Sequence, residues 1–242
     1  TVTFDGGTVQ TITGTIAASA DGEGVIIFSG DSGDVTDIVT ISGAVGTSAK
    51  KIGTITSGVA TAQTSTAFTS DVFANTITHG LNQNWVGDTT ITMDFNGNAT
   101  FTTLTVTGGS AAAGEDAAVT AAGNLTGTTI ALVEGGTGQA QLTLDGTSAQ
   151  TVTAAITSAA AGTGTLTISN NATLTNNVGL ATNDELALVT IDSAKTLTMS
   201  GGKTLNATLI DVTGNLKVSN GTLLLSDAGT STVTFAAASG LI

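Results

Sequence analysis

Residues 142–170 read LTLDGTSAQTVTAAITSAAAGTGTLTISN, and this stretch decides the fold. It has an echo in residues 2–30, VTFDGGTVQTITGTIAASADGEGVIIFSG, which aligns without a gap at an offset of 140 with 11 of 29 positions identical. Each copy alternates apolar and polar residues in short segments separated by Asp-Gly and Gly-rich turns, which is the pattern of half-buried strands. Internal repetition of this kind predicts a fold built from similar, stacked units.

The last part of the chain has the clearest strand rhythm, as in residues 196–225, TLTMSGGKTLNATLIDVTGNLKVSNGTLLL. Two spacings, 19 residues from Leu197 to Leu216 and 17 residues from Val218 to Phe235, indicate a coil of about 20 residues. We therefore predict an all-β fold, a parallel β-helix (β-solenoid) with three short strands in each coil. Antiparallel β-sandwich domains remain the alternative, because their turns recur at a similar spacing.

The predicted organisation is a single continuous β-solenoid over residues 1–242, with residues 2–30 and 142–170 as an internal repeat. Residues 64–90 are the least regular part of the sequence. Phe68, Phe73, His79 and Trp85 gather there, and we predict an irregular insertion or loop.

The composition limits both the core and the partners. Aromatic residues make up only 3% of the chain, so a core of large rings is excluded and Val, Ile, Leu and Ala are expected instead. The net charge of −13 argues against binding to nucleic acid or to anionic membranes. No apolar run approaches the ~18 residues of a membrane helix, so no membrane insertion of this segment is expected.

The best candidate for a metal site is the acidic turn formed by Asp31, Asp34 and Asp37. Three carboxylates within seven residues offer the oxygen ligands that Ca²⁺ prefers. The competing interpretation is a solvated acidic turn, because no calcium-loop motif surrounds these residues. No cofactor other than calcium is suggested by the sequence.

Two other groups of residues are candidates for chemistry. Asp5 and Asp145 recur with a following glycine, and paired carboxylates cleave glycosides, but Asp-Gly also closes turns and explains both positions. His79 and Trp85 suggest a binding patch, but a lone histidine in a chain without cysteine assembles neither a triad nor a zinc site. The sequence therefore predicts that the protein is not an enzyme.

Five asparagines begin an N-x-[ST] tripeptide, the acceptor pattern for N-glycosylation. Chance predicts about as many in so Thr-rich a chain. The pattern is therefore uninformative about modification. These residues are Asn98, Asn124, Asn171, Asn206 and Asn220.

The two ends of the chain share the tetrapeptide TVTF, at residues 1–4 and 232–235. A solenoid with uncapped ends exposes unpaired strand edges, and such edges invite another copy to stack on them. A head-to-tail contact that does not close produces an open filament. The residues predicted to take part in this self-assembly are Val2, Phe4, Val233, Phe235, Leu241 and Ile242.

Runs such as residues 149–179, AQTVTAAITSAAAGTGTLTISNNATLTNNVG, and residues 195–226, KTLTMSGGKTLNATLIDVTGNLKVSNGTLLLS, resemble the passenger regions of bacterial autotransporter surface proteins. That group includes the large rickettsial surface antigens and related repetitive surface-layer proteins. The resemblance implies a right-handed β-helix displayed outside the cell for adhesion, shielding or lattice formation. It carries over no catalytic or binding residues.

Together these observations predict a non-enzymatic extracellular structural protein at the cell surface. It would form a homopolymer by end-to-end or lateral contacts, as a subunit of a filament, sheath or surface layer. The alternative is an adhesin passenger domain that binds a host or a neighbouring cell.

Overall fold

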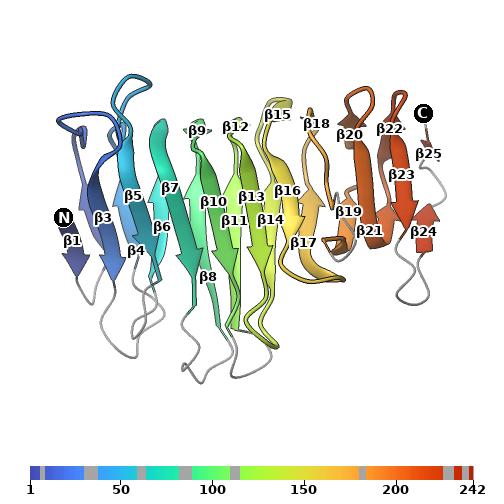
Figure 1. Cartoon of the computed structure of the whole chain (residues 1–242), viewed down its shortest axis with the longest axis horizontal. Coiled ribbons are helices and arrows are strands. Elements are labelled where there is room, and N and C mark those ends of the chain that lie inside the picture. Colours follow the sequence, from blue (N-terminus) through green and yellow to red (C-terminus); the bar gives the residue numbers. More distant parts are fainter. Residues whose placement is uncertain are drawn as a thin grey trace.

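The computed structural model describes residues 1–5, 9–29, 38–58, 64–81, 89–109, 115–179, 184–225, 232–235 and 240–241. Short strands stack along one long axis, with the two ends of the chain at opposite ends of the stack (Figure 1). All pairings between named strands are parallel. The fold is therefore a β-solenoid, as predicted, and not a pair of antiparallel sheets.

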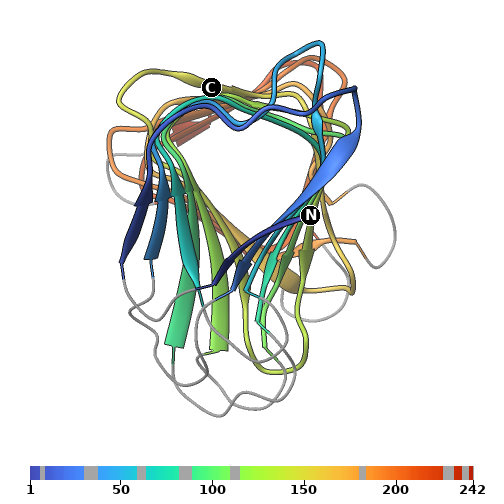
Figure 2. The same ribbon diagram turned by 90° about the vertical axis from the view of Figure 1, so that its left-hand side faces the viewer.

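Seen along its axis, the stack has three sides, which we call faces 1, 2 and 3 in the order in which the chain visits them (Figure 2). Face 1 contains β1 (Val2–Asp5), β3 (Glu23–Ser29), β5 (Ile52–Ser57), β7 (Val72–Gly80), β10 (Thr103–Thr107), β13 (Thr129–Val133), β16 (Ala155–Ser158) and β23 (Thr222–Leu225). Face 2 contains β2 (Gln10–Ile12), β4 (Ile38–Ile41), β6 (Ser65–Phe68), β8 (Thr89–Phe95), β11 (Glu115–Ala121), β14 (Ala140–Leu144), β17 (Thr163–Ile168), β19 (Leu186–Ile191), β21 (Thr204–Val212) and β24 (Thr232–Phe235).

Face 3 is narrower, because its strands are only two to four residues long. It contains β9 (Ala99–Thr100), β12 (Leu125–Thr126), β15 (Gln150–Val152), β18 (Ala172–Leu174), β20 (Thr196–Met199), β22 (Asn215–Val218) and β25 (Gly240–Leu241). Single bridges from Ile16 to Val45 and from Val45 to Val72 continue this face to the N-terminal end. Two strands turn corners: β7 begins on face 3, and β21 begins on face 1, where it pairs with β23.

The alternating pattern places every second side chain inside, and the parallel register aligns these side chains from rung to rung. On face 1, one such row joins ten residues. The eight between its ends are at most 2% exposed. The row runs Val2, Ile26, Ile55, Ile77, Leu104, Ile130, Ile156, Val178, Leu205 and Leu223.

The coil is longer and less regular than the predicted 20 residues. Successive members of the face 1 row are separated by as few as 18 residues, from Leu205 to Leu223, and by as many as 29, from Ile26 to Ile55. Leu216 stacks on Leu197, as the 19-residue spacing predicted, but Phe235 pairs with Val212 and not with Val218. Corner segments of unequal length cause this variation, and the alternating pattern does not record them.

The two repeated stretches contain strands at equivalent positions, but these strands lie on different faces of the solenoid. Residues 2–5 form β1 on face 1, whereas the matching residues 142–145 include the end of β14 on face 2. The offset of 140 residues is therefore not a whole number of coils. The repeat encodes a strand-corner-strand unit that any face accepts.

The core is mostly aliphatic, as predicted, but the exclusion of large rings was wrong for its N-terminal half. Phe28, Phe68 and Phe95 are at most 1% exposed. The rings of Phe4 and Phe28 stack at 5.4 Å, Phe28 meets Phe68 edge to face at 5.8 Å, and Phe68 stacks on Phe95 at 5.5 Å. Seven phenylalanines in the chain are enough for this column because the solenoid places four of them in adjacent rungs.

The predicted irregular insertion at residues 64–90 is regular where the structure describes it. Residues 65–68 form β6, residues 72–80 form β7, and residues 89–90 begin β8. Residues 82–88, which include Trp85, lie outside the described residues. Within the described part of the chain, no helix is long and apolar enough to span a membrane.

Candidate assembly surface

The N-terminal rung is open on its outer side. β1 pairs only with β3 and β2 pairs only with β4, so each has one edge without a strand partner among the described residues. The Val2 side chain is 49% exposed although it belongs to an inward row, and Val9 is 67% exposed. Phe4 is partly buried against the core. This end therefore presents apolar side chains and a free strand edge to solvent.

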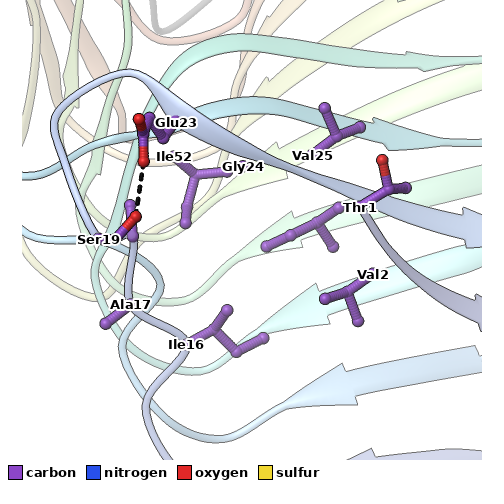
Figure 3. Close-up of a pocket in the computed structure, with 11 residues that line it drawn as sticks. Thr1, Val2, Ile16, Ala17, Ser19, Glu23, Gly24, Val25 and Ile52 are labelled. Atoms are coloured by element: carbon purple, nitrogen blue, oxygen red, sulfur yellow. Dashed lines mark hydrogen bonds between the residues drawn. The ribbon is translucent and has the colours of Figure 1, made fainter.

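A cavity of about 280 Å³ opens at the same end (Figure 3). Its lining is mainly apolar and includes Val2, Ile16, Val25, Ile26 and Ile52. Every interior rung is covered on both sides, but Val2 and Ile16 belong to the first rung, which has no rung beyond it in the described chain. The cavity is the uncovered mouth of the solenoid core.

The rim of this mouth is polar. Ser19 donates a hydrogen bond to a carboxylate oxygen of Glu23 at 2.6 Å (Figure 3). The main-chain N–H of Lys51 donates to Asp21 at 2.9 Å. Both bonds lie at the corner that leads from face 3 to face 1.

At the C-terminal end, the described residues that were predicted to assemble lie on faces 2 and 3, and β23 lies at the end of face 1. β23 ends face 1, and its Leu224 is 46% exposed. Val233 and Phe235 pair with Ile210 and Val212 on face 2, and Leu241 pairs with Leu216 on face 3. Ile242 lies outside the described residues.

The shared tetrapeptide TVTF does not make the two ends equivalent. Residues 2–4 belong to β1 on face 1, whereas residues 232–235 form β24 on face 2. A copy stacked in line would therefore not place one tetrapeptide on the other. The hypothesis of self-assembly therefore rests on the open strand edges and not on this identity.

The acidic turn proposed to bind calcium, Asp31, Asp34 and Asp37, lies outside the described residues. Among the residues that the structure does describe, no group of three or more His, Cys, Asp or Glu side chains is arranged to hold a metal ion. The calcium site therefore stays a prediction.

Asp5 and Asp145 are not brought together, because Asp5 ends β1 in the first rung and Asp145 follows β14 on another face. The neighbour of Asp145 is Asp94 on β8. Burial raises the pKa of Asp94, a hydrogen bond with Thr120 lowers it, and the charge of Asp145 raises it. Burial also raises the pKa of Asp145. Paired chemistry between Asp5 and Asp145 is thereby excluded.

His79 is fully buried, so its side chain does not contribute to a binding patch on the surface. In its inward row it lies between Ser57 and Val106. Its Nε2 donates to the main-chain oxygen of Ile91 at 3.2 Å, which places the proton of the neutral ring on Nε2. Burial lowers the pKa of His79 to about 4, although the bond to Ile91 opposes this shift. The His79 side chain therefore links β7 to β8 from inside the core, at the corner between faces 1 and 2.

This buried ring predicts a loss of stability in mild acid. In the unfolded chain His79 titrates near 6.5, whereas in the folded chain it titrates near 4. Between these values the unfolded state binds more protons, so the free energy of unfolding falls as the pH is lowered from 6.5 to about 4. The shift corresponds to roughly 3 kcal/mol. Urea denaturation at several pH values across this window measures it.

The matched variant is His79→Leu, because Leu132 occupies the same inward row two rungs further on. We expect this variant to fold and to lose the histidine part of the pH dependence, while the carboxylates titrate as before. Equal pH dependence in the two proteins would contradict the assignment.

A ladder of asparagines along the corner between faces 2 and 3 was missed in the sequence. The Asn98 main-chain N–H donates to Asp71, Asn124 donates to the Asn98 side-chain oxygen, and Thr151 donates to the Asn124 side-chain oxygen, at 2.9, 3.0 and 2.7 Å. Asn171 accepts from Thr196 in the same way at 2.9 Å. Three of the N-x-[ST] tripeptides therefore lie at a corner where hydrogen bonds connect successive rungs.

The middle of face 1 is rich in threonine, and its strands β5, β7 and β10 contain no Asp, Glu or Lys. On three consecutive rungs its outward, half-buried side chains are all threonine: Thr54 and Thr56, Thr76 and Thr78, Thr103 and Thr105. This is a regular surface of hydroxyl and methyl groups in the middle of the described solenoid. Comparisons with family models, with curated proteins and with solved structures find no match, so function is inferred from the geometry alone.

Proposed function

We propose that this chain is a non-enzymatic structural protein of the cell exterior, a β-solenoid subunit that assembles end to end into a surface filament, sheath or layer. The single observation that supports the proposal best is the uncovered mouth at the N-terminal rung, where an inward-row valine and a cavity of about 280 Å³ face solvent. Apolar surface of this kind gains about 25 cal/mol per Å² when it is covered. A second copy supplies both the strand partners and the apolar cover.

The test introduces a charge that only the assembled state would bury. Val2→Lys places an ammonium group on the open rung, where it stays solvated in the single subunit because this position is 49% exposed. In a joint it would be enclosed by apolar neighbours at a cost of several kcal/mol. We expect the unaltered chain to form rods, seen by sedimentation velocity and negative-stain electron microscopy, and Val2→Lys to remain monomeric.

The control is Thr105→Lys, which adds the same charge to an outward position in the middle of face 1. It is expected to assemble like the unaltered chain. Monomers of the unaltered chain at all salt concentrations would overturn the proposal, as would rods of Val2→Lys equal to those of the control.

The alternative role, an adhesin passenger that contacts a host or neighbouring cell, is favoured by the threonine surface of face 1. Flat arrays without charge or deep pockets suit contact with another extended surface. Beads coated with the chain would then adhere to cells, and Thr78→Lys would reduce adhesion while Val2→Lys would not. The opposite pattern would assign adhesion to the end of the solenoid.

A further inference from the structure

We propose that the outward threonines of face 1 bind ice. They lie on four neighbouring strands in the interior of the solenoid, β5, β7, β10 and β13 (Figure 1). The proposal is independent of end-to-end assembly, because it uses no residue of the end rungs. Its basis is the spacing of these threonines, their free hydroxyl groups and the absence of charge among them.

The parallel register stacks threonine on threonine in two adjacent outward rows. The first row has threonine in four consecutive rungs, at Thr54, Thr76, Thr103 and Thr129. The second row has threonine in three of these rungs, at Thr56, Thr78 and Thr105, and continues with Ala131. All seven threonines are half-buried, so each still presents part of its side chain to solvent. We call these seven residues the threonine array.

The fold sets both repeats of the threonine array. Neighbours within a row are ~4.8 Å apart, the distance between stacked strands, and the two rows are about 6.6 Å apart, which is two residues along a strand. A β-branched side chain has few χ1 rotamers, so its hydroxyl and methyl groups stay in order. Water oxygens on a prism face of hexagonal ice also repeat along two perpendicular directions, with spacings similar to these. The threonine array therefore matches an ice surface in two directions at once.

The hydroxyl groups of the threonine array are free to bond water. None of them makes a hydrogen bond with another residue in the described part of the chain. Threonines at the edge of face 3 differ, because Thr153 Oγ1 accepts from the Gly127 N–H at 3.1 Å and Thr175 Oγ1 donates to the Val152 carbonyl at 3.4 Å. A hydroxyl offers one donor and two acceptor sites, so each one in the array is able to join a water network.

No charged side chain interrupts the array. The two rows continue onto β3 with Val25 and Ile27, and onto β16 with Ala155 and Thr157. Their outward positions from β3 to β16 therefore contain Thr, Val, Ile and Ala alone, in a chain with a net charge of −13. A charged group loses its hydration at a large cost, whereas methyl groups gain when they are covered. This surface suits an uncharged partner such as ice.

Face 2 shows what the same residue type looks like without such an array. Its adjacent outward row includes Gln141 and Leu188, and its threonine row ends at Asp94 and Asp211. The threonines of this single row are Thr120, Thr143, Thr167 and Thr190. Face 2 therefore supplies a matched control position.

The test measures thermal hysteresis, which is the gap between the melting and growth temperatures of an ice crystal in a solution of the full chain. Incorporation of the protein into slowly growing ice is measured beside it. We expect the unaltered chain to show a gap, to shape the crystal and to enter the ice. Thr78→Lys places a longer, charged side chain in the middle of the array and is expected to lower the hysteresis roughly tenfold. Thr167→Lys makes the same change on face 2 and is expected to leave it unchanged.

Thr103→Lys repeats the test in the other row and the next rung. Circular dichroism and urea denaturation establish that all three variants are folded. An unaltered chain without hysteresis, crystal shaping or incorporation into ice would overturn the proposal, as would equal hysteresis in Thr78→Lys and Thr167→Lys. Adhesion to cells that Thr78→Lys abolishes, with no effect of the chain on ice, would assign the array to a cell surface instead. Neither result would change the proposed end-to-end assembly.

Discussion

Phe68→Ala is expected to reduce the free energy of unfolding by about 3 to 5 kcal/mol. The Phe68 ring is 1% exposed and lies in the middle of the phenylalanine column, stacked on Phe95 and edge-on to Phe28. Its removal leaves a cavity between two rungs. Because each rung of a solenoid contacts only its neighbours, such a cavity weakens the coupling between the parts on either side. Urea denaturation followed by circular dichroism measures the loss.

The control for this substitution is Thr105→Ala, which removes an outward, half-buried side chain from β10. It is expected to change stability by less than about 0.5 kcal/mol. If Phe68→Ala cost no more than this control, the phenylalanine column would not be a main element of the core.

Gly46→Ala is expected to reduce the free energy of unfolding by roughly 2 to 5 kcal/mol. This is the sum of the cost of a left-handed backbone at alanine and the cost of the steric overlap of its Cβ. Gly46 has a φ of +70°, and an added Cβ would overlap the main-chain oxygen of Phe73 on the next rung. The residue lies where face 3 bends, and its N–H donates to Ile16 in the first rung at 2.8 Å. Thermal or urea unfolding of the purified variant gives the cost.

Gly24→Ala is the matched substitution, because Gly24 has a φ of +86° but nothing within 4 Å of an added Cβ. It is expected to show only the backbone cost of about 1 to 2 kcal/mol. Equal losses for the two glycines would contradict close packing of the rungs at the corner.

Strand identity could be predicted well from the sequence because alternation is a local property. The segments around Leu197 and Leu216 stack as their spacing indicated. Coil length could not be predicted, since corner segments vary and leave no periodic signal. Residues 64–81 were misread for a related reason: Phe68 and His79 look out of place in a Thr-rich strand, although both point inward at regular positions.

The sites were predictable only in part. The apolar residues of the N-terminal rung, Val2 and Phe4, follow from the argument about open edges. The burial of His79 could not be foreseen, because it depends on a register set by Ser57 and Val106 in other rungs. The corner ladder was visible in principle, since Asn98 and Asn124 each precede an inward apolar residue and a threonine. It is recognisable only from the structure, which shows that these asparagines are neighbours in successive rungs.

The central claim is that one copy continues the strand ladder of the next. The rows stack parallel strands at ~4.8 Å per level, so copies joined end to end predict a ~4.8 Å repeat that continues from one copy into the next. Electron cryo-microscopy of assembled material should show this repeat with parallel strands continuous across the joint. Rods in which a gap between subunits interrupts this repeat, or single particles alone, would contradict the account.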